Sequence, residues 1–416
     1  MKKYLQKLGH AAYRASLYKV DTKIKNKVLL KFSYLLKKNA SKILRQNNKD
    51  IKFAKIKNIN KNLITRLEIN KPKLDSIIKT IIEITKLKDP VGVILDKWQR
   101  PNGLRIKKIS IPIGVIGVIY ESRPNVTVDL SCLCFKSGNS VILKGGSEAF
   151  FTNQIFINLF RESLKAYKVD INYVQFINKK DRRIVKSLLK DMSNYIDVII
   201  PRGGKNLVKT VKELCNVPVI GHLEGICHTF IDKSINSKMA RDIVINAKMR
   251  SVGICGATET LLIHKDCPKK KINFILNSLK INGCLIYADN KIRKIFNGNL
   301  KNATNKDWST EYLDAKISVK IVKNVVEAVK HINKFGTMHT DSIITNNIES
   351  ANYFVRSVKS SIVMHNTSTQ FADGGELGFG GEVGISTNKL PPRGPVGLNQ
   401  LVSYKYHIAG NGQIRK

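Results

Sequence analysis

One stretch in the middle of the chain alternates short apolar runs with longer amphipathic segments, and this alternation restricts the fold more than any other feature. The short runs are rich in valine and isoleucine, as buried strands are, and the longer segments repeat apolar residues at the helical period. The expected strands are Val141–Leu143, Val174–Ile177 and Val198–Ile200, and the expected helices are Thr152–Tyr167 and Asp181–Met192. Strand–helix–strand units of this kind predict an α/β fold with a largely parallel sheet covered by helices on both faces.

The rest of the chain divides into a helical N-terminal part and a second region of alternating strands and helices. Apolar residues recur at three- and four-residue intervals from Met1 to about Lys88, and Ile106–Tyr120 has the composition of strands. The second alternation runs from Thr229 to about Val363. Its expected helices are Ser237–Arg250, Lys269–Asn282 and Val325–Phe335.

Length and composition predict a globular protein with at least two domains. At 416 residues and 43% hydrophobic content, the chain can bury more than one core. Residues 1–20 lack an uninterrupted apolar segment and a cleavage site, and no apolar run approaches the roughly 20 residues of a membrane-spanning helix. We therefore expect a soluble, cytoplasmic protein without a membrane partner.

The cysteines and the charge argue against two other classes of protein. Seven scattered cysteines favour free thiols, and Cys132 and Cys134 lack the spacing of a zinc knuckle, so we expect no metal site. The net charge of +41 is compatible with nucleic-acid binding. However, lysine, isoleucine and asparagine are enriched together along the whole chain, and aromatic residues are not interleaved with the lysines, so we expect solvated helix faces and no nucleic-acid partner.

Two glycine-containing turns are candidates for phosphate binding. Lys144, Gly145, Gly146 and Ser147 follow one expected strand, and Arg202, Gly203 and Gly204 follow another. Glycines at such turns let the backbone approach a ligand at the start of a helix, where free N–H groups favour an anion. Neither turn matches the spacing of a known phosphate-binding motif, so an ordinary strand–helix turn is the alternative.

Cys255 is the candidate nucleophile. It lies between Gly253 and Gly256, after an expected helix that carries Lys248 and Arg250. Small neighbours give access to the sulfur, and nearby cations favour the reactive thiolate. The alternative is a buried structural cysteine, since no histidine is close to it in the sequence.

Several segments of the chain resemble the γ-glutamyl phosphate reductase family of the aldehyde dehydrogenase superfamily. These segments are Val115–Thr127, Asn246–Cys255, His331–Asp341, Ser368–Ser386 and the closing Gly410–Arg415. The resemblance extends over essentially the whole chain. The glycine- and proline-rich stretch around the fourth of these segments also predicts a structured loop region, where functional sites often lie.

The resemblance implies an aldehyde dehydrogenase-like fold with two Rossmann-like open-sheet domains and a β-hairpin extension. Residues 1–95 and 113–226 would form the dinucleotide-binding domain, and residues 227–385 the catalytic domain. Residues 96–112 and 386–416 would form the oligomerisation hairpin and the C-terminal tail. The hairpin is expected to pair with the tail of a partner subunit in a homo-oligomer.

The resemblance also implies a reaction. L-Glutamyl 5-phosphate is reduced by NADPH to L-glutamate 5-semialdehyde with release of phosphate, in the second step of proline synthesis. Cys255 would form a thioacyl intermediate that accepts hydride. Association with a glutamate 5-kinase is a further expectation. The alternative from the same superfamily is an NAD(P)-dependent dehydrogenase that oxidises a semialdehyde to an acid.

Site residues follow from the same matching. Asn125 is expected to donate to the oxyanion together with the Cys255 backbone N–H, with a turn residue after Pro124 as the alternative. Lys144 is expected to contact the adenosine ribose or its phosphate, and Glu311 the nicotinamide ribose, with an exposed loop acid as the alternative for Glu311. Ser147 stands where many NAD-linked relatives have a glutamate, and the missing charge favours NADPH.

The substrate ligands and the missing base complete these expectations. Arg123, His339 and Arg393 are candidates for the phosphate and carboxylate of the substrate, with structural ion pairs or a buried core histidine as alternatives. Aldehyde-oxidising relatives use a glutamate to activate water. Here the segment Gly221–Glu224 places Gly221 at that position, in a register that Glu224 leaves open.

Overall fold

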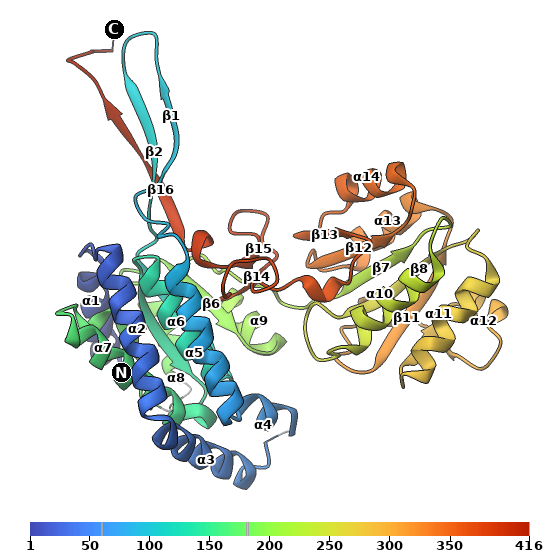
Figure 1. Cartoon of the computed structure of the whole chain (residues 1–416), viewed down its shortest axis with the longest axis horizontal. Coiled ribbons are helices and arrows are strands. Elements are labelled where there is room, and N and C mark those ends of the chain that lie inside the picture. Colours follow the sequence, from blue (N-terminus) through green and yellow to red (C-terminus); the bar gives the residue numbers. More distant parts are fainter. Residues whose placement is uncertain (60, 180, 182, 416) are drawn as a thin grey trace. The chain divides into compact units, whose positions relative to one another are not determined.

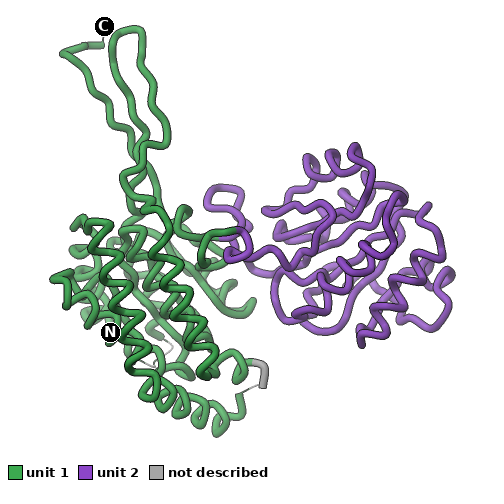
Figure 2. The backbone as a smooth tube through the Cα atoms, viewed as in Figure 1, with its two compact units in different colours: residues 1–221, 378–384, 396–416 green, residues 222–377, 385–395 purple. Residues whose placement is uncertain are grey.

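The computed structural model describes residues 1–59, 61–179, 181 and 183–415, which form two compact units. Unit 1 comprises residues 1–221, 378–384 and 396–416, and unit 2 comprises residues 222–377 and 385–395 (Figure 2). The boundary after Gly221 lies before the expected one at residue 226. Residues 378–384, expected in the catalytic segment, belong to unit 1, and the first part of the expected tail belongs to unit 2.

The N-terminal part of unit 1 is helical, as predicted. Its helices are α1 (Lys2–Ser16), α2 (Thr22–Lys38), α3 (Ala40–Ile56), α4 (Lys61–Leu67) and α5 (Lys71–Lys86). Their starts follow from capping, because the side chains of Asp21 and Asn70 accept backbone N–H groups in the first turns of α2 and α5. Their apolar faces, including Leu29, Phe32 and Ile81, are buried in the core of unit 1.

The predicted parallel sheet of unit 1 is present, with strand order β5-β4-β3-β6. Its strands are β3 (Val115–Tyr120), β4 (Ser140–Gly145), β5 (Val174–Phe176) and β6 (Val198–Arg202). The connecting helices are α6 (Pro124–Lys136), α7 (Phe150–Ala166) and α8 (Arg183–Asp191), and α9 (Lys205–Leu214) follows β6; residue 182 of the expected helix lies outside the described residues. The strand order reverses between β3 and β6, and ligands of open parallel sheets bind beyond the carboxyl ends of the strands at such a point.

The hairpin forms as expected, and in this chain it pairs with its own C-terminal tail; its expected pairing with the tail of another subunit stays a prediction. β1 (Ile94–Gln99) pairs with β2 (Arg105–Pro112), and β2 pairs antiparallel with β16 (Val402–Ala409) of the same chain. The resulting sheet projects from the helices of unit 1 (Figure 1). The side chain of Asn139 gives the reason, because it accepts from the N–H of Gly114 (2.8 Å) and donates to the carbonyl of Leu401 (2.7 Å). The start of the tail is thereby fixed beside the end of β2, so pairing within the chain costs little further entropy.

Unit 2 contains a seven-stranded parallel sheet with the order β10-β9-β11-β8-β7-β12-β13. Its strands are β7 (Cys227–Ile231), β8 (Thr258–His264), β9 (Leu285–Ala288), β10 (Lys301–Asn302), β11 (Lys316–Val322), β12 (Thr340–Ile344) and β13 (Ile362–His365). Its helices are α10 (Ser237–Met249), α11 (Lys269–Ile281), α12 (Asn290–Ile295), α13 (Val325–Phe335) and α14 (Ile348–Ser357). The three helices expected here are confirmed, and separate apolar cores include α10–α12 and α13–α14.

The glycine- and proline-rich stretch near the end of the chain is structured, as expected. It contains the short paired strands β14 (Gly384–Ser386) and β15 (Gly394–Val396). All seven cysteines, each among the described residues, carry free thiols. Among the described helices, none is both long and apolar enough to cross a membrane.

Candidate active site

Cys255 lies in the loop between α10 and β8, at the amino end of β8, and its side chain is partly exposed. A close backbone approach defines this position. A Cβ atom on Gly225 would overlap the Cys255 carbonyl group, so only glycine lets the segment before β7 pass this closely. The thiol of Cys227 donates to the same carbonyl oxygen over 3.1 Å.

Two histidines meet Cys255 because three neighbouring strands begin at the same edge of the sheet. β8, β7 and β12 are adjacent and parallel, and Cys255, His222 and His339 precede them in that order. One ring nitrogen of each histidine and the Cys255 sulfur lie within 4.8 Å of one another. The imidazole rings meet edge to face, with centroids 4.8 Å apart.

The backbone and neighbouring side chains orient both histidines. His222 Nδ1–H donates to the Ile385 carbonyl oxygen over 2.7 Å, because a carbonyl only accepts. His222 Nε2 is therefore the ring nitrogen through which this side chain makes its other polar contacts. His339 is completely buried, and its Nδ1 lies 2.9 Å from Thr340 Oγ1 and 3.6 Å from Cys227 Sγ.

This environment favours the thiolate of Cys255. Burial alone raises the pKa of the thiol, but the charge of His339 and further interactions with His222 and His339 outweigh burial and hold the pKa well below its ordinary value. An accessible cysteine with a lowered pKa is a nucleophile. Sequence reasoning identified the cysteine and missed His222, although it examined the segment Gly221–Glu224 for a carboxylate. His339 was expected at the substrate, and the structure places it beside the sulfur.

Cys255 is expected to react with iodoacetamide at pH values at which an ordinary thiol is protonated. The alkylation rate of the Cys255 peptide, followed by mass spectrometry, should rise with pH through an inflection well below about 8.5. Below the inflection the thiolate takes up a proton and the rate falls. His339→Asn removes the stabilising cation, so the inflection should move upward, with roughly tenfold slower alkylation at neutral pH for each unit. His10→Asn is the control, and an inflection unmoved by His339→Asn would show that this histidine does not set the acidity.

Glu311 contacts the backbone segment that lies against Cys255. Its Oε1 accepts from the N–H of Gly225 over 2.9 Å, and burial raises its pKa more than this bond lowers it. The loop that carries Glu311 lies next to a buried ion pair, in which Lys248 bonds Glu259 at 2.6 Å. Glu259 also accepts from the N–H of Leu313, and this bond fixes the loop. Burial raises the pKa of Glu259 to about 7 against the effect of Lys248. Glu311 is therefore a partly buried group of the site rather than a free loop acid.

The segment Gly221–Glu224, where relatives have the glutamate that activates water, divides between the two units. Gly221 belongs to unit 1, where a Cβ atom would lie 3.4 Å from Pro201. Glu224 belongs to unit 2 and is close enough to Glu311 to raise the pKa of that carboxyl. The assignment of Gly221 to the position of the base stays a prediction.

The two arginines expected at the substrate occupy different units. Arg393, in unit 2, donates to the Lys359 carbonyl and to Ser361 Oγ, contacts of the structural kind that sequence analysis kept as the alternative. Arg123, in unit 1, immediately precedes α6, and its charge contributes to lowering the pKa of Lys73 after the larger effect of burial. A role of either guanidinium in substrate binding stays a prediction.

Asn125 lies in the first turn of α6 in unit 1, where its side chain donates to Asp129 over 3.3 Å. Burial raises the pKa of Asp129 to about 6, against the effects of Asn125 and Arg202. Arg202 in turn lies 3.9 Å from Glu382. Sequence reasoning predicted Asn125 and Arg202 separately and did not predict the carboxylates of their neighbours Asp129 and Glu382.

The turn after β4 places a buried cation at the carboxyl end of the strand. Lys144 is 7% exposed, its ammonium donates to the Gly145 carbonyl over 2.8 Å, and burial lowers its pKa. Gly146 precedes the short 3₁₀ turn that begins at Ser147. Glu148 in this turn accepts from the N–H and hydroxyl of Ser122 at 2.7 and 2.8 Å, which ties the turn to the end of β3.

The turn after β6 is already bonded to a carboxylate. Gly204 caps α9, and its N–H donates to Glu121 over 2.9 Å. A Cβ atom on Gly203 would overlap the same carboxylate. A phosphate at this helix start would have to displace Glu121, so the turn after β4 is the better candidate of the two.

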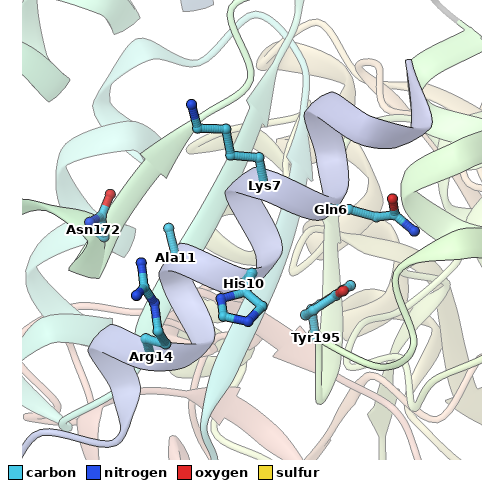
Figure 3. Close-up of a pocket in the computed structure, with 7 residues that line it drawn as sticks. All are labelled: Gln6, Lys7, His10, Ala11, Arg14, Asn172 and Tyr195. Carbon is cyan, nitrogen blue, oxygen red and sulfur yellow. The ribbon is translucent and has the colours of Figure 1, made fainter.

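A separate hollow lies along α1 in unit 1. Figure 3 shows its lining, which includes Lys7, His10 and Arg14 from one face of the helix together with Asn172 and Tyr195. None of the residues expected at the active site lines this hollow.

The fold of the chain is aldehyde dehydrogenase-like. An acetylating aldehyde dehydrogenase from Geobacillus thermoglucosidasius matches over 100% of this chain and 98% of its own, with a TM-score of 0.70 and 17% identity. A probable aldehyde dehydrogenase from Listeria monocytogenes matches with a TM-score of 0.71 and 14% identity. At these identities the likeness concerns the fold.

Closer relatives give the family. The γ-glutamyl phosphate reductase of Bartonella quintana is 44% identical over 415 residues, covering 100% of both chains, and that of Caldanaerobacter subterraneus is 45% identical over 95% of both. The crystal structure of the Thermotoga maritima γ-glutamyl phosphate reductase has a TM-score of 0.96 and 39% identity, covering 99% of this chain and 100% of that chain. No protein-family model matches the sequence. The chain belongs to the γ-glutamyl phosphate reductase family.

Proposed function

We propose that the protein reduces L-glutamyl 5-phosphate to L-glutamate 5-semialdehyde with NADPH and releases phosphate, as the second step of proline synthesis. The observation that carries this proposal is the Cys255 thiol between His222 and His339, in a member of this family. An acyl phosphate is an electrophile with a good leaving group, and a thiolate is the nucleophile that suits it.

The two histidines hold Cys255 as a thiolate before it attacks the acyl carbon. The C–S bond forms, the bond from the acyl carbon to the phosphate oxygen breaks, and phosphate leaves with the electron pair. The product is a thioester on Cys255. When the thioester has become a tetrahedral hemithioacetal anion, the C–S bond breaks, the aldehyde leaves and the thiolate is restored. His222 and His339 stabilise that thiolate as they did at the start.

Asn125 and the Cys255 backbone N–H are proposed as donors to the oxyanion in both halves of the reaction. Lys144, Gly145, Gly146 and Ser147 are proposed to hold the dinucleotide, and the buried ammonium of Lys144 at the carboxyl end of β4 fits a phosphate-bearing group. Glu311 is proposed for the nicotinamide ribose. When bound, NADPH supplies the hydride that reduces the acyl carbon.

The family also suggests how the chain is organised in solution. We propose unit 1 for dinucleotide binding and unit 2 for catalysis, in a cytoplasmic homo-oligomer that associates with a glutamate 5-kinase. The sheet β1–β2–β16 is the proposed oligomerisation element. Its exposed apolar side chains, which include Trp98, Tyr404, Tyr406 and Ile408, support a contact there.

Oxidation of glutamate 5-semialdehyde should depend on inorganic phosphate. NADP⁺ reduction, followed by absorbance, is measured with the semialdehyde in the presence and absence of phosphate, because the reverse reaction needs phosphate to release the acyl group from Cys255. Equal rates without phosphate would identify a hydrolysing semialdehyde dehydrogenase instead. Folded protein that is inactive under both conditions would contradict both enzyme functions.

A further inference from the structure

The side chains of His222, Cys255 and His339 could hold a metal ion, because one ligand atom of each lies within 4.8 Å of the others. We propose that they bind a thiophilic divalent cation such as Zn²⁺, and that the bound cation reversibly inhibits the enzyme. Imidazole nitrogen and thiolate sulfur are both ligands that zinc uses in proteins, and three such ligands leave a fourth tetrahedral position for water.

The distances allow such a site after a small adjustment. With Zn–S of about 2.3 Å and Zn–N of about 2.0 Å, tetrahedral ligands lie about 3.3–3.6 Å from one another. The three ligand atoms here already lie within 4.8 Å of one another. Cys255 is partly exposed in a loop, so its side chain can rotate to bring the sulfur closer to the two nitrogens.

The surroundings orient the histidines as ligands. Metal-binding histidines donate their other ring N–H to a carbonyl or similar group, and His222 donates to the Ile385 carbonyl in this way. Thr340 Oγ1 contacts His339 Nδ1, while His339 Nε2 is buried and has no hydrogen-bonding partner among the described residues. This nitrogen is the unpartnered group that a cation would satisfy.

The ligand chemistry also selects the cation. Sulfur and imidazole favour zinc and cobalt, whereas Mg²⁺ and Ca²⁺ prefer oxygen ligands. A cation bound to the Cys255 sulfur withdraws electron density from it and blocks its approach to the acyl carbon, so the thiolate becomes a poorer nucleophile. Inhibition should therefore be strong with Zn²⁺, absent with Mg²⁺ at the same concentration, and reversed by a chelator.

A titration with Co²⁺ measures metal binding without depending on catalysis. In a titration of the reduced full-length protein with Co²⁺, wild type is expected to bind one ion with a thiolate-to-cobalt charge-transfer band, and Zn²⁺ should abolish the band. Cys255→Ser should lose the band, and His222→Asn and His339→Asn should each weaken binding at least about tenfold. Cys215→Ser is the matched control, because Cys215 is the other cysteine that is not fully buried, and it should keep the band.

Three results would overturn the proposal. They are a wild-type protein without the band, a band that survives in Cys255→Ser, and unchanged affinity in both histidine variants, which would show binding by sulfur alone. Circular dichroism of each variant shows that a lost band is not lost folding. Since the titration contains no substrate, its failure leaves the proposed reaction untouched, and the failure of that reaction leaves the titration valid.

Discussion

Cys255→Ser is expected to lower the phosphate-dependent oxidation of glutamate 5-semialdehyde at least about 10⁴-fold, equivalent to about 5.5 kcal/mol of transition-state stabilisation. The serine hydroxyl has nearly the same shape but stays protonated near neutral pH. His222 and His339 lower the pKa of a thiol, and the same environment does not ionise an alcohol. The steady-state rate of NADP⁺ reduction measures the effect.

Cys215→Ser is the matched control for this substitution. Cys215 is a partly exposed thiol at the end of α9 in unit 1, so its loss should leave the rate within about twofold. Retention of more than a tenth of the wild-type rate by Cys255→Ser would exclude the covalent mechanism. In that case the acyl group would not pass through this sulfur.

The helices and strands were predicted mainly from the local spacing of apolar residues. The helix expected at Val325–Phe335 begins and ends at the residues where α13 does, because a capping asparagine, Asn324, precedes it and Gly336 follows it. The order of strands in unit 2 was not predictable in this way. β8 pairs with both β7 and β11, a choice that depends on which helix faces pack together rather than on local sequence.

The candidate active site also depends on contacts between distant segments, which local sequence does not predict. The glycines beside Cys255 are local, and they supported an accessible cysteine from sequence alone. Its two histidines come from distant segments and meet the sulfur only because β7, β8 and β12 are neighbours. The absence of a nearby histidine in the sequence was the argument for a structural cysteine, and the structure removes that argument because a sheet brings together the starts of its strands.

The pairing of β16 with β2 of the same chain was not predicted, for a similar reason. Exposed strands pair with whichever edge is held beside them, and no sequence pattern distinguishes an edge of the same chain from that of a partner. Within this chain, the side chain of Asn139 bonds both Gly114 and Leu401, and this places the start of β16 beside the end of β2. An asparagine after a helix predicts only a turn, so its bond to the distant Leu401 was not visible in the sequence.

Asn125→Ala is expected to lower kcat by about 10²–10³-fold, with a much smaller change in KM. A donor to the oxyanion acts mainly when negative charge develops on oxygen, so its loss affects the transition state more than substrate binding. The alanine also leaves the carboxylate of Asp129 without the amide that donates to it. Steady-state kinetics with saturating phosphate measure both constants.

Asn158→Ala is the control, because Asn158 is an exposed asparagine on α7 of the same unit. A second measurement separates catalysis from folding. Asn125 does not contribute to the lowered pKa of Cys255, which depends on His222 and His339, so the pH profile of iodoacetamide alkylation should be unchanged in Asn125→Ala. A shifted profile would mean that the substitution disturbs the thiol itself. A kcat within threefold of wild type would remove Asn125 from the oxyanion site and leave its bond to Asp129 as its role.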